Sequence, residues 1–178
     1  GDFEKNIEVS RGFFKHTGIN NATLRNVTIG DNCLIENIGN YINNYTIGDD
    51  CYISNVSAME TTEGATYGEG NLISVLNEVG DGNVILFSDL NSQLAAFMVK
   101  HFNDRALKDS LRRLINEDIA RHRSDQAYIG NHVKIVNTRE INNTIVHDDC
   151  EINGASRLSD CTILSSENAS VYIGTGVI

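Results

Sequence analysis

The sequence predicts a mainly β fold in which one chain winds as a single-stranded parallel β-helix, interrupted by a helical hairpin. Three observations predict it. A 12-residue pattern occurs three times, its first two copies begin 18 residues apart, and the pattern stops over one stretch with helical periodicity. The chain has 178 residues, 40% of them hydrophobic, which is enough to bury a core in one domain.

The repeated pattern combines aliphatic positions, turn residues and a cysteine. Its copies read LRNVTIGDNCLI, INNYTIGDDCYI and INNTIVHDDCEI, at residues 24–35, 42–53 and 141–152. The second and third copies are identical at seven of twelve positions. A related stretch begins at Ile129, and a weaker one begins at Tyr67. Such self-similarity is typical of a repeat architecture.

The spacing of the pattern predicts flat strands joined by tight corners. Aliphatic residues six positions apart point inward from successive faces, and the cysteine two positions before the second aliphatic residue also points inward. Gly, Asn and Asp between them tolerate the left-handed backbone conformation of a corner. One coil per 18 residues follows, rising about 4.8 Å per coil at the usual strand spacing. Frequent asparagine fits stacked corners, and the absence of proline fits an unbroken ladder.

The repeat stops between Phe87 and Gln126, where apolar residues take helical spacing. We expect a helical hairpin with helices at about 89–102 and 104–122. Possible N-caps are Ser88 or Asp89 for the first helix, and Asn103 or Asp104 for the second.

The domain organisation follows from the extent of the repeat and of the helical stretch. We expect one β-helix domain over residues 1–178, with coils at about 20–87 and 127–178 and the insertion at about 88–124. The chain begins with Gly rather than Met and ends as a further repeat begins, so we expect a fragment of a longer protein.

Charge limits the classes of partner. The net charge is −10, which argues against nucleic acid and against an anionic membrane. Half of the Lys and Arg residues fall between positions 100 and 123, and Arg105, Lys108 and Arg112 share one helix face. This face suggests either phosphate or nucleotide binding or a solvated surface with salt pairs, and we favour the solvated surface.

Three of the four cysteines, Cys33, Cys51 and Cys150, occupy the same position of the repeat. We expect them to be small apolar fillers of the core. Reduced thiols of this kind fit a cytoplasmic protein. Neither the cysteines nor the histidines have the spacing of a structural zinc site, so we expect no metal.

The pattern resembles the hexapeptide-repeat superfamily, whose members form left-handed parallel β-helices. Four phrases resemble, more narrowly, the N-terminal part of a long bacterial hexapeptide-repeat family of uncharacterised function. They are HTGINNATL at 16–24, IENIGNYI at 35–42, SVLNE at 74–78 and EINGASRL at 151–158. The left hand of the helix is implied by this resemblance alone, because crossover connections are normally right-handed.

The resemblance implies a transferase-like protein that transfers an acyl group to a sugar or a sugar nucleotide. Acyl-CoA or a nucleotide sugar would be the small-molecule donor, and a homotrimer would be the assembly. Hexapeptide acyltransferases use a histidine as general base, and His16 is the catalytic candidate because the narrower family's phrase contains it. Asn77, Glu78 and Arg157 lie in two of the other phrases and are the substrate-binding candidates.

Corner positions carry two further patterns. His147 occupies a slot that holds glycine in the other copies, and His132 also lies in a corner. The adjacent carboxylates at 49–50 and 148–149 recur at equivalent corners, where they suggest either a Ca²⁺ site or simple turn propensity; we favour the latter.

Two other functions stay open. One is a non-catalytic structural or interaction module, and the other is the regulatory tail of a sugar nucleotidyltransferase. The fold does not decide between these functions and a transferase.

Overall fold

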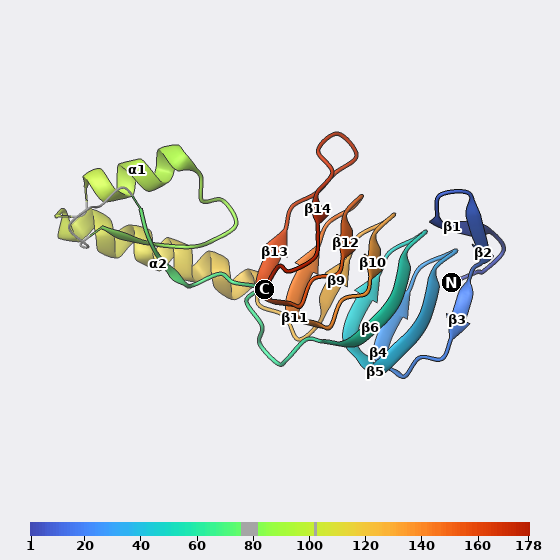
Figure 1. The fold of residues 1–178 in the computed structure, drawn as a ribbon. Coiled ribbons are helices and arrows are strands. Elements are labelled where there is room, and N and C mark those ends of the chain that lie inside the picture. Colours follow the sequence, from blue (N-terminus) through green and yellow to red (C-terminus); the bar gives the residue numbers. More distant parts are fainter. Residues whose placement is uncertain (76–81, 102) are drawn as a thin grey trace. The chain divides into compact units, whose positions relative to one another are not determined.

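The structure is a computed structural model that describes residues 1–75, 82–101 and 103–178. It is mainly β, as the sequence predicts (Figure 1). The strands are β1 (Asn6–Ser10), β2 (Phe13–His16), β3 (Gly18–Asn20), β4 (Leu24–Ile29), β5 (Leu34–Ile47), β6 (Tyr52–Glu60), β7 (Leu72–Ser74), β8 (Asn83–Ile85), β9 (Ala127–Ile129), β10 (Lys134–Val136), β11 (Glu140–Val146), β12 (Glu151–Asn153), β13 (Arg157–Ile163) and β14 (Tyr172–Ile173). The helices are α1 (Ser92–Lys100) and α2 (Arg105–His122).

The chain divides into two compact units. The strand unit consists of residues 1–67 and 124–178, and the helical unit consists of residues 68–123. Among the described residues, no helix combines the length and the apolar character needed to cross a membrane.

Parallel pairing organises the strand unit into three ladders. The first ladder runs through β3, β5, β6, β10, β12 and β14. The second runs through β4, β5, β6, β11 and β13, and the third through β4, β5, β9, β11 and β13. The arrows of β6, β10 and β12 lie side by side in Figure 1. Each stretch of chain that contributes to all three ladders forms one rung.

The inward side chains fill the core in straight columns, because parallel pairing places equivalent residues directly above one another. Ile35 pairs with Ile53, which belongs to the same column as Ile135 and Ile152, and all four are fully buried. The sequence prediction for the cysteines is confirmed. All three lie in the core. Cys33 and Cys51 have no exposed surface, and Cys150 is 2% exposed.

One corner column repeats a left-handed backbone conformation in four successive rungs. Its residues are Asn32, Asp50, His132 and Asp149, with φ between 53° and 57°. Asn and Asp tolerate this conformation because their short polar side chains bond to the local backbone.

The residue before each of these corner positions is hydrogen-bonded to its counterpart in the next rung. The peptide N–H of Asp31 donates to Asp49 Oδ1 at 2.7 Å, and that of Asp49 donates to Asn131 Oδ1 at 2.8 Å. The N–H of Asn131 donates to Asp148 Oδ1 at 2.8 Å. Gly48 precedes this column, and a Cβ there would lie 2.8 Å from the carbonyl carbon of Gly130, so a larger residue would not fit at position 48 without a shift of the next rung. The repeated carboxylates at 49 and 148 therefore have a structural role.

The insertion leaves the repeat inside a rung, after β6. The third position of that rung is supplied by β9, which pairs with the last residues of β5. Asp49 bonds to a residue 82 positions later instead of about 18, and the column continues.

This finding corrects the predicted boundaries of the coils and of the insertion. The stretch from Tyr67 to Ile73 is not a further coil. Residues 68–87 belong to the helical unit, where β7 pairs with β8 antiparallel. A short apolar strand has the same sequence pattern in a hairpin as in a parallel rung. The pattern therefore assigned the strand at residues 72–74 to the β-helix rather than to the hairpin.

The helical unit contains the predicted pair of helices around a small core of Phe87, Ile115 and Ile119. Asp104 caps α2 by accepting a hydrogen bond from the N–H of Leu107, as predicted. The predicted cap of the first helix is wrong: Asn91, not Ser88 or Asp89, caps α1.

The antiparallel hairpin of β1 and β2 covers part of the outer face of the first ladder. Ile7 packs against an apolar cluster that includes Leu34 and Tyr52. Beside it, Lys15 Nζ lies 2.8 Å from an oxygen of Glu36, a carboxylate that is 8% exposed. This ion pair raises the pKa of Lys15.

Candidate functional site

His16, the predicted catalytic residue, is exposed on β2. Its Nδ1 atom lies 2.8 Å from the carbonyl oxygen of Thr17, the adjacent residue. This contact orients the ring but places no acidic or nucleophilic group beside it. The structure therefore shows His16 as a surface histidine of a hairpin strand.

The predicted substrate-binding residues do not join His16 in one site. Arg157 begins β13, and its Nε lies 3.9 Å from a carboxylate oxygen of Glu140, its partner in the second ladder. Asn77 and Glu78 lie outside the described residues.

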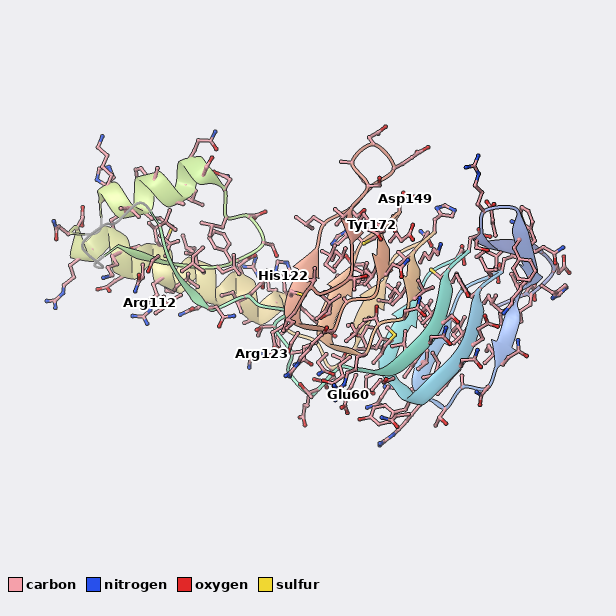
Figure 2. All side chains as sticks on the ribbon, in the orientation of Figure 1. Glu60, Arg112, His122, Arg123, Asp149 and Tyr172 are labelled. Atoms are coloured by element: carbon pink, nitrogen blue, oxygen red, sulfur yellow. The ribbon has the colours of Figure 1, made fainter. Side chains whose placement is uncertain are left out.

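A groove of about 470 Å³ runs instead along the corner that precedes β6, β10, β12 and β14. It lies within the strand unit, with β1 contributing Ile7 and Glu8 to one wall. Tyr172, which is 65% exposed, lines it with Asp149, and Figure 2 shows both side chains on this side of the strands. The volume falls within the range of small-molecule sites, roughly 300–1,000 Å³.

At the centre of the groove, His132 lies between two carboxylates. Its Nδ1 atom is 3.4 Å from Asp149 Oδ1, and its Nε2 atom is 3.8 Å from Asp50 Oδ2. The three residues occupy the same corner slot in consecutive rungs, so parallel stacking alone brings them together. The imidazole is 61% exposed, and the carboxylates are 34% and 28% exposed.

Other charges of the groove are arranged as pairs. Lys134 Nζ lies 3.4 Å from Glu151 Oε1 on the adjacent rung, and Lys5 Nζ lies 3.7 Å from Asp50 Oδ1. Such exposed pairs contribute little to stability, typically about 0–1 kcal/mol. They do place both hydrogen-bond acceptors and a donor in the groove.

His132, rather than the thiol nearby, is the candidate for proton transfer in the groove. Burial, with a smaller effect from Glu151, raises the pKa of Cys150 from 9.0 to about 11, so the thiol is neutral at pH 7. A carboxylate beside Nδ1 can orient an imidazole. Nε2 of His132, 3.8 Å from Asp50 Oδ2, is too far from that oxygen for a hydrogen bond and can accept a proton. Among the described residues, no three His, Cys, Asp or Glu side chains are grouped so as to hold a metal ion.

A second histidine contact lies at another corner of the strand unit. Tyr128 Oη lies 2.8 Å from Nε2 of His147, and the rings meet edge to face with centroids 5.3 Å apart. Partial burial, with a smaller effect from Asp148, raises the pKa of Tyr128. The hydroxyl of Tyr128 is hydrogen-bonded to Nε2 of His147, the nitrogen that would have to accept a proton in a general base. This pair is therefore less suited to proton transfer than His132.

Comparison with known families supplies one match. The family described as Domain of unknown function (DUF4954) matches residues 1–178. The chain belongs to this family. No curated protein and no solved structure matches the DUF4954 chain.

The site in this DUF4954 chain was not predicted as a site, although a signal for it was present. The repeat pattern predicts that His132 lies in a corner and that carboxylates recur at equivalent corners, but neither prediction alone places His132 beside them. Aligning Asn32, Asp50, His132 and Asp149 as one slot of the repeat would have predicted their stacking.

Proposed function

We propose that the strand unit is a left-handed parallel β-helix of the hexapeptide-repeat type. Its ladders support this proposal, because each rung stacks on one about 17 or 18 residues away except where the insertion intervenes. The small thiols inside the core and the Asn, Asp and His residues at left-handed corners also support it. The left hand itself rests on the resemblance of the repeat. The four free cysteines favour a cytoplasmic location.

The function that the geometry supports best is transferase-like, with a sugar or sugar-nucleotide hydroxyl as acceptor and His132 as general base. The observation that carries this proposal is the position of His132 between Asp149 and Asp50 in an open groove. The carboxylates and the lysine that line the groove suit the hydroxyl groups of a sugar, and the exposed ring of Tyr172 offers an apolar face.

The proposed reaction uses an acyl thioester such as acyl-CoA as donor. Nε2 of His132 takes the proton of the acceptor hydroxyl, and the hydroxyl oxygen attacks the thioester carbonyl. The C–S bond breaks, and the thiolate that leaves takes the proton from the imidazolium. Asp149 holds Nδ1 throughout, so its role is to position the ring.

The test is a thermal-shift and NMR screen of the chain against coenzyme A, acetyl-CoA and a panel of nucleotide sugars. A ligand at 100 times its dissociation constant stabilises the protein by about 2.7 kcal/mol. We expect a shift that is lost in His132→Asn and kept in His16→Asn, a matched change at an exposed histidine outside the groove. Thiol release from acetyl-CoA in the presence of the bound sugar then tests the chemistry.

A non-catalytic module is the alternative, and the ion pairs of the groove favour it. Lys134 and Asp50 already have partners, so these charges need no ligand. A well-folded sample that binds none of the panel, or that loses binding in His16→Asn and not in His132→Asn, would overturn the assignment of His132.

A further inference from the structure

The helical unit contains a cavity of about 320 Å³ that the proposed transferase function does not use. It lies between the β7–β8 hairpin and helices α1 and α2, and all of its lining residues belong to residues 68–123. Its volume is at the lower end of the range for small-molecule sites.

Six of the ten described residues that line the cavity are apolar. Ile85, Met98, Leu111 and Ile115 line it, and Ile115 is almost completely buried at 4% exposure. Leu72 on β7 also lines the cavity and is 64% exposed, so it is accessible to a ligand. An apolar surface of this kind favours a ligand with a flexible hydrocarbon part.

Two cations of α2 line the same cavity. Lys108 and Arg112 are four residues apart, so they lie on one side of the helix, and both are exposed. Figure 2 shows the Arg112 side chain projecting from this helix. Like charges at this spacing repel and so destabilise the helix.

Within the described residues, Lys108 and Arg112 take part in no ion pair, although the chain carries 24 Asp and Glu residues. His101, at the C-terminal end of α1, lines the same cavity. Two cations that have no ion-pair partner among the described residues, beside these apolar side chains, are complementary to an anionic head group.

We propose that this cavity binds an acyl chain that ends in an anionic head group, a carboxylate or a phosphate. The aliphatic residues hold the chain, and Lys108 and Arg112 bind the head. A nucleotide fits less well, because the described lining offers no Phe, Tyr or Trp ring on which a base could stack.

Calorimetric titration of the full chain tests the proposal with four probes below their micelle concentrations. Decanoate and decyl phosphate carry both parts of the ligand and distinguish the two head groups. Decanol carries only the chain, and inorganic phosphate carries only the charge. We expect saturable binding of at least one of the first two probes, and much weaker binding of the last two.

Variants locate the site. Lys108→Ala and Arg112→Ala should each weaken binding about tenfold, as expected for one charge-assisted contact. Leu72→Ser should also weaken it, and this exposed position is a safe one for folding. Arg113→Ala is the matched control, because Arg113 is an exposed cation of the same helix that does not line the cavity.

The proposal would be overturned by three results: no saturable binding of decanoate or decyl phosphate, equal binding of decanol, or equal losses in Arg112→Ala and Arg113→Ala. Because His132 lies in the strand unit, His132→Asn should leave this binding unchanged. Failure of the transferase proposal is therefore distinguishable from failure of this one.

Discussion

Nδ1 of His132 lies 3.4 Å from Oδ1 of Asp149, its counterpart in the same corner slot of the next rung. The contact is a direct result of stacking, because both residues have a left-handed backbone with φ of 55° and 57°. A repeat that specifies a corner thus also specifies which side chains meet at it. Position 132 therefore needs a residue that tolerates a left-handed backbone as well as a side chain that can accept a proton.

The backbone requirement at His132 predicts how two substitutions affect stability. Asn adopts the left-handed conformation readily, so we expect His132→Asn to leave the free energy of unfolding nearly unchanged. A β-branched residue does not, so His132→Val should destabilise the protein by about 1–2 kcal/mol. Urea denaturation measures both. Lys134→Val, in strand β10, is the matched control; an equal loss there would contradict a corner-specific cost.

Asn137 lies in the middle of a column of side-chain amides. It accepts a hydrogen bond from Asn55 Nδ2 at 3.1 Å and donates one to Asn153 Oδ1 at 3.4 Å, with a backbone φ of 52°. Asn137→Gly removes the hydrogen bonds and adds backbone freedom to the unfolded chain but imposes no strain at positive φ, whereas Asn137→Ala removes the hydrogen bonds and imposes left-handed strain. We expect the alanine variant to unfold about 1 kcal/mol more easily than the glycine variant. Thermal denaturation of the pair measures the difference, and a more stable alanine variant would disprove it.

The pKa of Cys150 predicts a loss of stability at alkaline pH. Its value in the folded protein, about 11, lies above the ordinary value of 9.0, so the folded state retains a proton that the unfolded state releases. The resulting stabilisation is complete below about pH 9 and is lost as the pH rises towards 11. Melting temperatures between pH 7 and 11 measure it. Cys150→Ala should flatten the decline, and an unchanged slope in that variant would rule out this cause.

The attachment of the insertion predicts that it can be removed. The N–H of Ser124 donates to the carbonyl of Ala65 at 3.1 Å, and Tyr67 Oη donates to the carbonyl of Ser124 at 3.3 Å. The two ends of the strand unit at the insertion therefore lie close together. Replacing residues 68–123 with a short Gly-Ser linker should shift Tm by less than about 5 °C.

Circular dichroism and thermal melting measure the effect of this excision. The helical signal should disappear, while the cooperative unfolding of the strand unit remains. A matched linker placed between Asn137 and Thr138, inside a continuous rung, should lower Tm far more. An excised chain that unfolds without a cooperative transition would show that the strand unit depends on residues 68–123.

By itself, the sequence determined the local features of this protein. Its repeat predicted the inward cysteines and the corner positions of Asn and Asp, and the helical spacing of apolar residues outside the repeat predicted the pair of helices. Side-chain periodicity and turn chemistry are local properties. The Asp104 cap was predicted for the same reason.

Only the tertiary structure decided which segments meet. It placed β9 beside β5 across the insertion, moved residues 68–87 into the helical unit, and separated His16 from the groove. Stacking brought Asp50, His132 and Asp149 together, and the fold of the helical unit placed Lys108 and Arg112 beside an apolar cavity. These relationships depend on contacts between residues far apart in the chain, which a local pattern does not contain.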